Sequence, residues 1–531
     1  MSLLAQLPLP LDRARLDAIV DSVSPTAASV VAGLAGVYLF VRWKTSGLDH
    51  VPAMGPTGLF TSYLGAQEYL KNAPKVVQRG YNKYKDGVFR VPYYDKWVVV
   101  VGSQRLVHDL RTSRDEDLSA ILGFGAIFAA KWTLGESFVT NDYHTKVIQS
   151  AMTRSISDRF ADVKDEVAHA FRDEVQFADG QEWVTLPGLA TTLRVISRAS
   201  NRLFVGAPLC RDPDYRDLMV NFAIGAMNSA KKINLFPHWL KPYAPALPLS
   251  ESWARSSQRS RAISSMQRRH LGPLIEERLR QDEKYGPTWP DRPNDLISWL
   301  LEHAPPEERN AHEITRRMLM VNFVAIHTSA NSFTQALFHL AHEPHYAGPL
   351  REELAAAVAE DGWTKTAMSR CVKLDSFLRE SQRFNGASAI NINRIVVNPN
   401  GFTFSDGTHL PQGTFLAAAT HATHHDGDNY TDPDVFDGFR FADMRGAGED
   451  RGSIKLQMVA PDVKYLSFGL GRHACPGRFF AVNELKLMLA YVLEHYDVKL
   501  EGPERPPTEW FGTLAAANRF GKVMFRKRTD V

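Results

Sequence analysis

A short stretch near the C-terminus, Phe468–Gly477, combines an aromatic ring, three glycines, an arginine, a cysteine and a proline. Gly469 and Gly471 permit positive φ and close backbone approach, so this turn can lie flat beneath a large planar ligand. Arg472 offers a fork of donors that matches a carboxylate. Cys475 precedes an apolar helical pattern, and the free N–H groups at a helix start favour an anionic sulfur and lower the thiol pKa. These residue types predict a thiolate ligand beneath a metal macrocycle that carries carboxylates.

A lone free cysteine is most often a buried structural residue, and this is the alternative for Cys475. The coincidence of Phe468, Gly469, Arg472 and Cys475 within one turn argues against it. The stretch resembles the haem-binding signature of the cytochrome P450 family, Phe-x-x-Gly-x-Arg-x-Cys-x-Gly, with Arg472 taken as its arginine. Thiolate ligation of haem iron favours cleavage of the O–O bond of bound dioxygen.

The composition is that of an ordinary globular protein with enough apolar content for a large core. Hydrophobic residues make up 44% of the 531 residues and charged residues 23%. The 62 Lys and Arg residues nearly balance the 59 Asp and Glu residues. Nucleic-acid binding needs a basic excess on one face, so this balance argues against a nucleic-acid partner. The three cysteines, Cys210, Cys371 and Cys475, are too few for a disulfide framework and fit a reducing compartment.

An uncharged apolar run, 27–41, lies near the N-terminus and is followed by Arg42 and Lys44. The run is slightly shorter than the ~20 residues of a typical membrane span. A cleaved signal peptide is one alternative, although no basic leader precedes the run and no small-residue cleavage site follows it. A buried helix is the other alternative. We expect a membrane anchor over 25–43 that leaves the C-terminal body in the cytosol, joined to it by a proline-containing linker at 44–56.

A long helical pattern, Ile314–Leu340, carries His327 and Thr328 within an apolar centre. In the P450 family the matching helix crosses the oxygen side of the haem with the pattern small–Gly–x–acid–Thr. Here Ala325 stands where glycine is commonest, His327 replaces the acid and Thr328 matches. A hydroxyl at that depth can order a water and pass protons, and His327 could titrate in the same chain. The alternative for His327 is a core histidine with satisfied hydrogen bonds.

Glu380 and Arg383 stand three positions apart in a predicted helix, Leu374–Phe384, and therefore share one helix face. Such a pair is common by itself, and its value lies in its order relative to Cys475. The segment 433–441 resembles the family's Pro-x-x-Phe-x-x-x-Arg-Phe segment, whose arginine, here Arg440, joins the pair. The resemblance implies a buried, structural charge network. Loss of one partner would strand a buried charge, at a cost of about 3–5 kcal/mol.

Two strands, Val88–Pro92 and Trp97–Val101, are predicted as a pair, and a third over Asn391–Val397 contains Arg394. The family position of Arg394 often reaches a haem propionate. The apolar, glycine-punctuated segment 121–128 resembles the loop over the substrate side of the haem, with plain core as the alternative. By resemblance we expect an apolar substrate pocket near Phe124, Phe128, Ala325, Ile390 and Phe511.

One segment departs from the family pattern. Where the family commonly has Trp-x-x-x-Arg in contact with a propionate, this chain has Tyr143–Gln149. Both fixed residues are missing, so no residue of this segment is predicted to contact the haem.

The resemblance covers the chain from about residue 51 to the C-terminus and combines four motifs in order. It implies the mainly α cytochrome P450 fold with a small β region. The several domains that length alone suggests then give way to one haem-thiolate monooxygenase domain at 57–531, behind the N-terminal segment 1–24, the anchor and the linker. It also implies haem b, with Cys475 as the axial ligand of its iron.

The implied reaction is monooxygenation of a small hydrophobic substrate, in which C–H becomes C–OH and the second atom of O2 leaves as water. No nicotinamide-binding fingerprint stands on a strand–turn–helix, so the electrons of NADPH must arrive through a separate protein. The family partner is NADPH–cytochrome P450 reductase of the endoplasmic reticulum membrane.

The segments 325–328 and 436–441 resemble a filamentous-fungal branch of secondary metabolism that includes ent-kaurene oxidases. We therefore expect a terpenoid substrate of the diterpenoid kind, with a steroid, polyketide or indole-derived skeleton or a xenobiotic as the alternative. Two other functions remain open: a haem-thiolate isomerase or dehydratase that needs no oxygen, and a haem-binding sensor or carrier without turnover.

Overall fold

The computed structural model describes residues 29, 33, 36, 37, 47–58, 61–93, 95–236, 241, 263–446 and 454–529. The predicted N-terminal segment 1–24 lies outside these ranges, and the predicted anchor at 25–43 is described at four positions only. Among the described residues, no helix is both long enough and apolar enough to cross a membrane.

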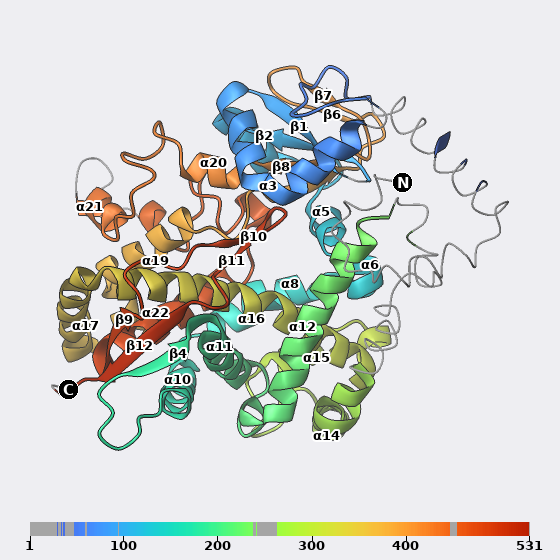
Figure 1. Ribbon diagram of the computed structural model, residues 1–531. Coiled ribbons are helices and arrows are strands. Elements are labelled where there is room, and N and C mark those ends of the chain that lie inside the picture. The colour runs from blue at the N-terminus through green and yellow to red at the C-terminus, as the bar shows by residue number, and fades with distance from the viewer. Residues whose placement is uncertain are drawn as a thin grey trace.

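Helices dominate the molecule, and the longest, α16 (Ala311–His342), runs through its centre (Figure 1). The Asn310 side chain starts α16 by accepting a hydrogen bond from the Glu313 N–H. Helices α10 (Phe160–Glu174), α11 (Gly188–Phe204) and α22 (Arg478–His495) bury apolar faces in the same core as α16. The remaining α-helices are α3 (Thr61–Lys83), α4 (Gln104–Thr112), α5 (Ala120–Ile127), α6 (Ala130–Thr133), α7 (Ser137–Thr140), α8 (Tyr143–Val147), α9 (Thr153–Ser155), α12 (Pro213–Ile233), α14 (Gly272–Tyr285), α15 (Leu296–His303), α17 (Ala347–Asp361), α18 (Lys365–Arg370), α19 (Val372–Phe384), α20 (Thr420–His424) and α21 (Arg440–Gly446).

The strands form small sheets at the edge of this helical body. The largest has the order β1–β2–β8–β5–β3 and lies with α3 at the top of Figure 1. Its strands are β1 (Val88–Pro92), β2 (Trp97–Val101), β8 (Phe415–Ala418), β5 (Asn391–Val396) and β3 (Leu118–Ser119); the others are β4 (Val184–Pro187), β6 (Phe402–Thr403), β7 (His409–Leu410), β9 (Tyr496–Leu500), β10 (Glu509–Phe511), β11 (Leu514–Ala516) and β12 (Lys522–Lys527).

Most elements expected from the sequence are confirmed. The antiparallel pair β1–β2 has the predicted bounds, with Val88 opposite Val101 and Pro92 opposite Trp97. All ten residues of the pair are buried, and eight of the ten are valine, phenylalanine or tryptophan, with Arg90 and Pro92 as the exceptions. The prediction of a loop over 121–128 was wrong, because the segment forms the helix α5. The Ser119 hydroxyl accepts a hydrogen bond from the Leu122 N–H and caps this helix.

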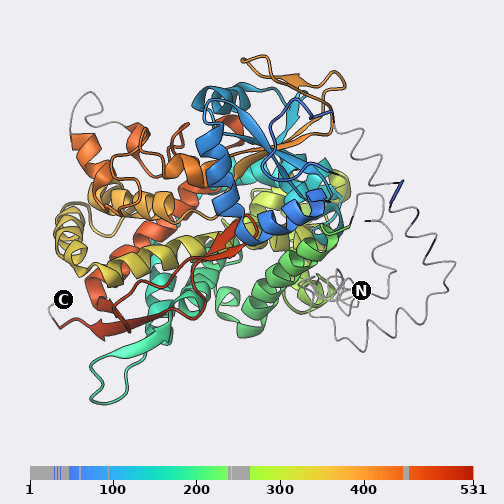
Figure 2. The ribbon, with the colours of Figure 1, turned by 45° about the horizontal axis from the view of Figure 1, so that its top comes forward.

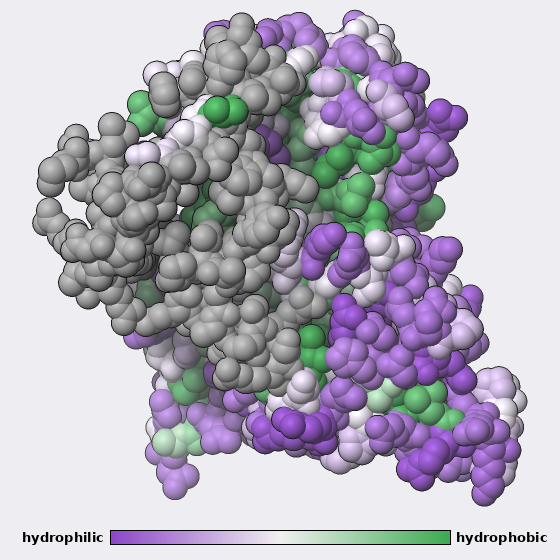
Figure 3. All heavy atoms as spheres, turned by 90° about the vertical axis from the view of Figure 1, so that its right-hand side faces the viewer, coloured by the Kyte–Doolittle hydropathy of each residue, from purple (hydrophilic) through white to green (hydrophobic). Residues whose placement is uncertain are grey.

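Two close approaches fix the elements that surround the centre of the molecule. A Cβ on Gly123 of α5 would lie 2.5 Å from the Asn393 carbonyl oxygen of β5, so only glycine fits there. The tip of the β10–β11 hairpin reaches α3, and a Cβ on Gly512 would lie 3.4 Å from Leu70 (Figure 2). The face on the right of Figure 1 carries apolar patches within a polar surface (Figure 3).

Candidate active site

The turn before α22 has the geometry that a planar ligand requires. Gly469 and Gly471 adopt φ values of +74° and +64°, in the left-handed region. The Cys475 N–H donates to the Phe468 carbonyl at 2.7 Å, and the Gly469 N–H donates to the Leu466 carbonyl at 3.0 Å. The Phe468 ring is buried. The backbone itself thus fixes the place of the sulfur.

The pKa of the Cys475 thiol differs from the expectation. The predicted donors are present, because the N–H groups of Gly477 and Arg478 and the Arg478 charge all lower this pKa. Burial is the larger influence, however, and the thiol pKa lies above 9.0. A positive ion bound to the sulfur would stabilise the thiolate in this buried position. The site therefore favours a metal-bound sulfur over a free thiolate.

The assignment of Arg472 needs a correction in the register of the motif. The signature's arginine stands two residues before the cysteine, and that position holds His473, whereas Arg472 lies one residue earlier. The Arg472 guanidinium is half exposed, donates to the Ser113 carbonyl and lies 3.8 Å from Asp115. His473 bonds the same carboxylate, with 2.6 Å between its Nε2 and the Asp115 oxygen.

Arg394 of β5 is a buried cation, and none of the carboxylates in the described ranges forms an ion pair with it. Its Nη1 donates to the Asn393 carbonyl at 3.0 Å, and its Nε has no hydrogen-bond partner among the residues that the structure describes. Burial lowers the pKa of this guanidinium to about 10, with the Arg472 charge acting in the same direction and Asp115 opposing. An unpaired, buried guanidinium is unfavourable by itself and fits an anionic group such as a haem propionate.

The segment that departs from the family pattern is not polar surface. His144 of α8 is buried, and its Nδ1 lies 3.0 Å from Nη1 of Arg317 on α16. Because an arginine can only donate, the imidazole proton must sit on Nε2. Burial, followed by the Arg317 charge, lowers the pKa of His144 to about 3 and keeps it neutral. No local sequence pattern predicts this pair, since its partners lie 173 positions apart.

Thr328 and His327 occupy different environments in the centre of α16. Thr328 is exposed between buried neighbours, and its hydroxyl donates to the Val324 carbonyl at 2.7 Å. His327 is partly buried, and its Nε2 has no partner within the described part of the chain. Burial lowers the pKa of His327 and a hydrogen bond with the backbone of Val220 on α12 opposes this, so the ring is neutral at pH 7. His327 is thus oriented toward α12 by its backbone contact.

The three residues of the proposed charge network meet behind the cysteine turn. Glu380 and Arg383 are fully buried and paired through two hydrogen bonds of 2.7 Å, and Arg440 Nε donates to Glu380 at 3.1 Å. Arg383 also donates to the His424 carbonyl at 2.6 Å. The Arg440 Nη1 donates to the Thr431 carbonyl at 2.5 Å. Each buried charge therefore has several partners, as a dry network requires.

The residues predicted for the substrate pocket fall into two groups. The rings of Phe124 and Phe128 in the α5 region pack at a tilt of 49° with centroids 4.8 Å apart, and Phe128 meets Phe323 of α16 edge-on at 5.2 Å. Ala325 packs partly buried against the same core. Ile390 belongs to the separate core cluster beneath α3 and the large sheet, and Phe511 is 41% exposed with the Lys231 ammonium over its ring. Phe124, Phe128 and Ala325 therefore pack against one core cluster, whereas Ile390 lies in a second cluster that also contacts Ala126 and Ile127 of α5.

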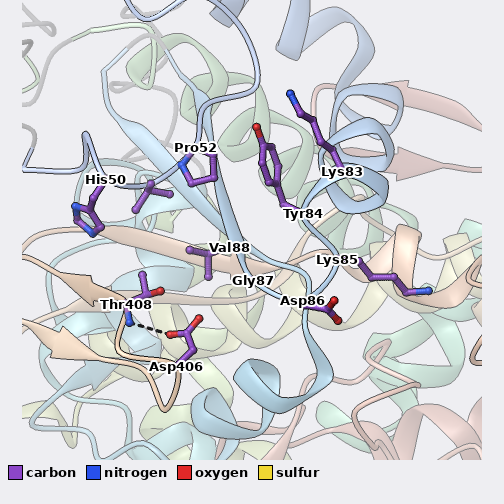
Figure 4. A pocket seen from close by; sticks show the side chains of 11 residues that line it. His50, Pro52, Lys83, Tyr84, Lys85, Asp86, Gly87, Val88, Asp406 and Thr408 are labelled. Atoms are coloured by element: carbon purple, nitrogen blue, oxygen red, sulfur yellow. Dashed lines mark hydrogen bonds between the residues drawn. The ribbon is translucent and has the colours of Figure 1, made fainter.

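A surface pocket of about 360 Å³ lies between the linker, the end of α3 and the β6–β7 turn (Figure 4). Its lining, taken over the described residues, contains none of the predicted site residues. Within it Asp406 accepts a hydrogen bond from the Thr408 N–H. The charged groups of the lining are of both signs and do not converge on one point, so this pocket is distinct from the site around Cys475.

Comparison with known proteins gives consistent matches over almost the whole chain. The family model described as Cytochrome P450 matches residues 52–521. Cytochrome P450 monooxygenase 151 of Postia placenta is 40% identical over 501 residues, which cover 94% of this chain and 97% of the relative. Cytochrome P450 monooxygenase CYP512U6 of Ganoderma lucidum is 33% identical over 97% of this chain and 98% of its own. An ent-kaurene oxidase of Gibberella intermedia is 32% identical over 93% of this chain and 91% of its own.

Proposed function

The chain belongs to the cytochrome P450 family, and from this premise we propose that it oxidises a terpenoid of diterpenoid size. The family implies a thiolate-ligated haem and monooxygenase chemistry, in which the haem activates dioxygen. The observation that carries the site is the turn that fixes Cys475 beside two glycines of positive φ.

The residues around that turn fit the haem. Cys475 would bind the iron, and Phe468 and Gly469 would lie along the ring. The unpaired Nε of Arg394 would donate to a propionate, with His473 and Arg472 beside it around Asp115. The Thr328 hydroxyl, already polarised by the Val324 carbonyl, would hold a water and pass its proton. His327 would assist that transfer through its Nε2, which has no hydrogen-bond partner among the described residues.

The substrate proposal has two supports. The relatives include proteins named ent-kaurene oxidase at 32–33% identity, and this name supports a diterpene as the kind of substrate to test first. The rings of Phe124, Phe128 and Phe323 form an apolar surface at α16. Such a surface suits a polycyclic hydrocarbon, which needs shape and apolar contact rather than hydrogen bonds. Steroid, polyketide and indole-derived skeletons are the competing substrates.

We further propose that the protein resides in the endoplasmic reticulum membrane through residues 25–43, with its catalytic domain cytosolic, and receives electrons from NADPH–cytochrome P450 reductase. The support is the apolar run at 27–41 with Arg42 and Lys44 behind it. The chain's near-neutral charge gives no reason to expect a nucleic-acid partner.

The test is product analysis from membranes that contain the full chain and a fungal reductase. The membranes are supplied with NADPH, oxygen-18-labelled O2 and a panel of diterpenes, sterols and indole-derived compounds. We expect oxygen-18 from O2 in a product of a diterpene and of few others. Turnover of the sterol or indole compounds alone would overturn the substrate proposal. A Phe128→Ala variant should weaken substrate binding about fivefold, whereas Phe520→Ala, at a ring that is 75% exposed, should not.

A further inference from the structure

One buried histidine links the charge network to the cysteine turn. The Leu466 N–H donates to Nε2 of His424 at 2.9 Å, and the His424 carbonyl accepts from Arg383 at 2.6 Å. His424 has no exposed surface, and its ring stacks on that of Tyr465 with centroids 5.7 Å apart. His424 therefore contacts the charge network through its backbone carbonyl and the cysteine turn through its ring.

The hydrogen bonds continue from this link to the sulfur ligand. The Leu466 carbonyl accepts from the Gly469 N–H at 3.0 Å, and the Phe468 carbonyl accepts from the Cys475 N–H at 2.7 Å. A shift of Leu466 would move the start of this turn and, through the backbone, the position of the Cys475 sulfur. Since Arg383 is held by Glu380 through two bonds, the far end of the chain is fixed.

The imidazole can make this link only in one protonation state. A backbone N–H must donate, so Nε2 is an acceptor and the proton sits on Nδ1. Burial, the Arg383 charge and the neighbouring His425 and His421 hold the pKa of His424 well below 6.5. Among the described residues, its Nδ1 has no hydrogen-bond partner. The ring is consequently neutral and in the required tautomer at pH 7.

We propose that His424 is a positioning residue for the haem-ligating thiolate, acting through its Nε2 acceptor on the Leu466 amide. It touches neither haem nor substrate and sets the sulfur position through the turn. The inference rests on the haem-thiolate site and not on the identity of the substrate.

Two conservative variants separate this role from packing. In His424→Gln the side-chain oxygen can reach the former place of Nε2, whereas in His424→Asn the shorter amide can reach only that of Nδ1. We expect the reduced, carbon monoxide-bound His424→Asn holoprotein to show about fivefold more of the non-thiolate Soret form than the wild type, the effect of one neutral hydrogen bond. His424→Gln should stay near the wild type, and the haem potential should shift in the Asn variant only.

The matched control is His425→Gln, which changes the adjacent ring. His425 bonds Asp434 at 2.8 Å and the Phe384 carbonyl at 3.2 Å, outside the chain that leads to the turn. We expect a wild-type spectrum and potential for it. Equal effects of Asn and Gln at 424, or no effect of Asn, would overturn the proposal. A wild type without the thiolate-type Soret band would instead refute the assignment of Cys475.

If the Asn variant does not fold, the wild type itself provides the test. Nitrogen NMR of holoprotein with labelled histidine reports which ring nitrogen of His424 carries the proton. The Nδ1–H tautomer, assigned by comparison with His424→Gln, is the expected result. A proton on Nε2 would exclude acceptance from Leu466 and would overturn the role.

Discussion

The cysteine side of the molecule and the side beneath α12 hold their elements together in different ways. Around Cys475, buried charges and backbone groups form continuous networks. In one of them the Glu380 carboxylate accepts hydrogen bonds from two arginines, Arg383 and Arg440. On the α12 side, the rings of Phe124, Phe128 and Phe323 pack against one another. The Asn234 side chain ties α12 to α5 by donating to the Ala126 and Ile127 carbonyls. Lys241 adds one buried ion pair, to Asp95 at 3.0 Å.

This difference matches two tasks. A metal ligand must stay within a small fraction of an ångström, and a fully satisfied polar network provides that rigidity. A pocket for bulky hydrocarbons needs apolar surface that can adapt, and rings with few directed bonds provide it. We therefore expect changes on the cysteine side to alter the haem spectrum and stability, and changes on the α12 side to alter substrate binding and coupling.

The largest effect is expected for Cys475→Ser, which removes the sulfur. Monooxygenase turnover should fall to background, and the reduced, carbon monoxide-bound protein should lack the thiolate-type Soret band. Cys371→Ser is the matched control, because that thiol is buried in the core and its pKa is raised by burial to about 11. Retention of the band in Cys475→Ser would contradict the whole site.

The next largest effect is expected for Glu380→Gln, which leaves two buried arginines without their carboxylate. Unfolding of the holoprotein in urea should show a loss of about 3–5 kcal/mol. Glu360→Gln, at a surface pair with Arg370, should change stability by less than about 1 kcal/mol. Similar losses for the two variants would show that burial does not set the value of these pairs.

On the other side, Thr328→Ala should separate chemistry from structure. We expect product formed per NADPH to fall about tenfold or more, the range of a lost proton-transfer group, with an unchanged Soret spectrum. Thr334→Ala is the matched control, because Thr334 lies on the same helix and its hydroxyl donates in the same way, to the Ala330 carbonyl at 2.7 Å. Unlike Thr328, Thr334 is fully buried. If Thr334→Ala uncoupled the reaction as strongly, the effect would belong to the helix and not to the hydroxyl.

The last effect is a gradual change with pH, small for each pH unit, and concerns Glu484 of α22. Its carboxyl accepts from Ser200 at 2.6 Å, and burial raises its pKa from 4.5 to about 8. Between these values the unfolded chain releases a proton that the folded protein keeps, so the contribution of Glu484 to stability is greatest below pH 4.5 and falls as pH rises toward 8. The slope is at most about 1.4 kcal/mol per pH unit.

Glu484→Gln removes this titration, and its urea-unfolding free energy should therefore decline less between pH 5 and pH 8 than that of the wild type. Glu501→Gln, at a carboxylate that is 53% exposed beside Lys522, should follow the wild type. Parallel pH profiles for Glu484→Gln and the wild type would show that the folded carboxyl is ionised.

Much of the framework follows from local patterns. Strands β1 and β2, the central helix α16 and the helix after Cys475 were all predicted from hydrophobic runs and their flanking residues, and the family was recognised from motifs whose order is a property of sequence. Glu380, Arg383 and Arg440 were also named in this way, because the motifs give their positions. Motif spacing also has to be counted strictly, because the signature's arginine position is held by His473 and not by Arg472.

Only the tertiary structure decided the partners of the buried polar groups. His424 meets Leu466 across 42 positions and His144 meets Arg317 across 173, and neither pair has a local pattern. Likewise, α5 can lie against β5 because Gly123 has no Cβ, a contact that no hydrophobic period reveals. Sequence fixes the types of residue that can bind a thiolate-ligated haem, since chemistry depends on side chains. Packing fixes which of them are dry, paired and oriented, since burial and hydrogen-bond geometry arise from segments far apart in the chain.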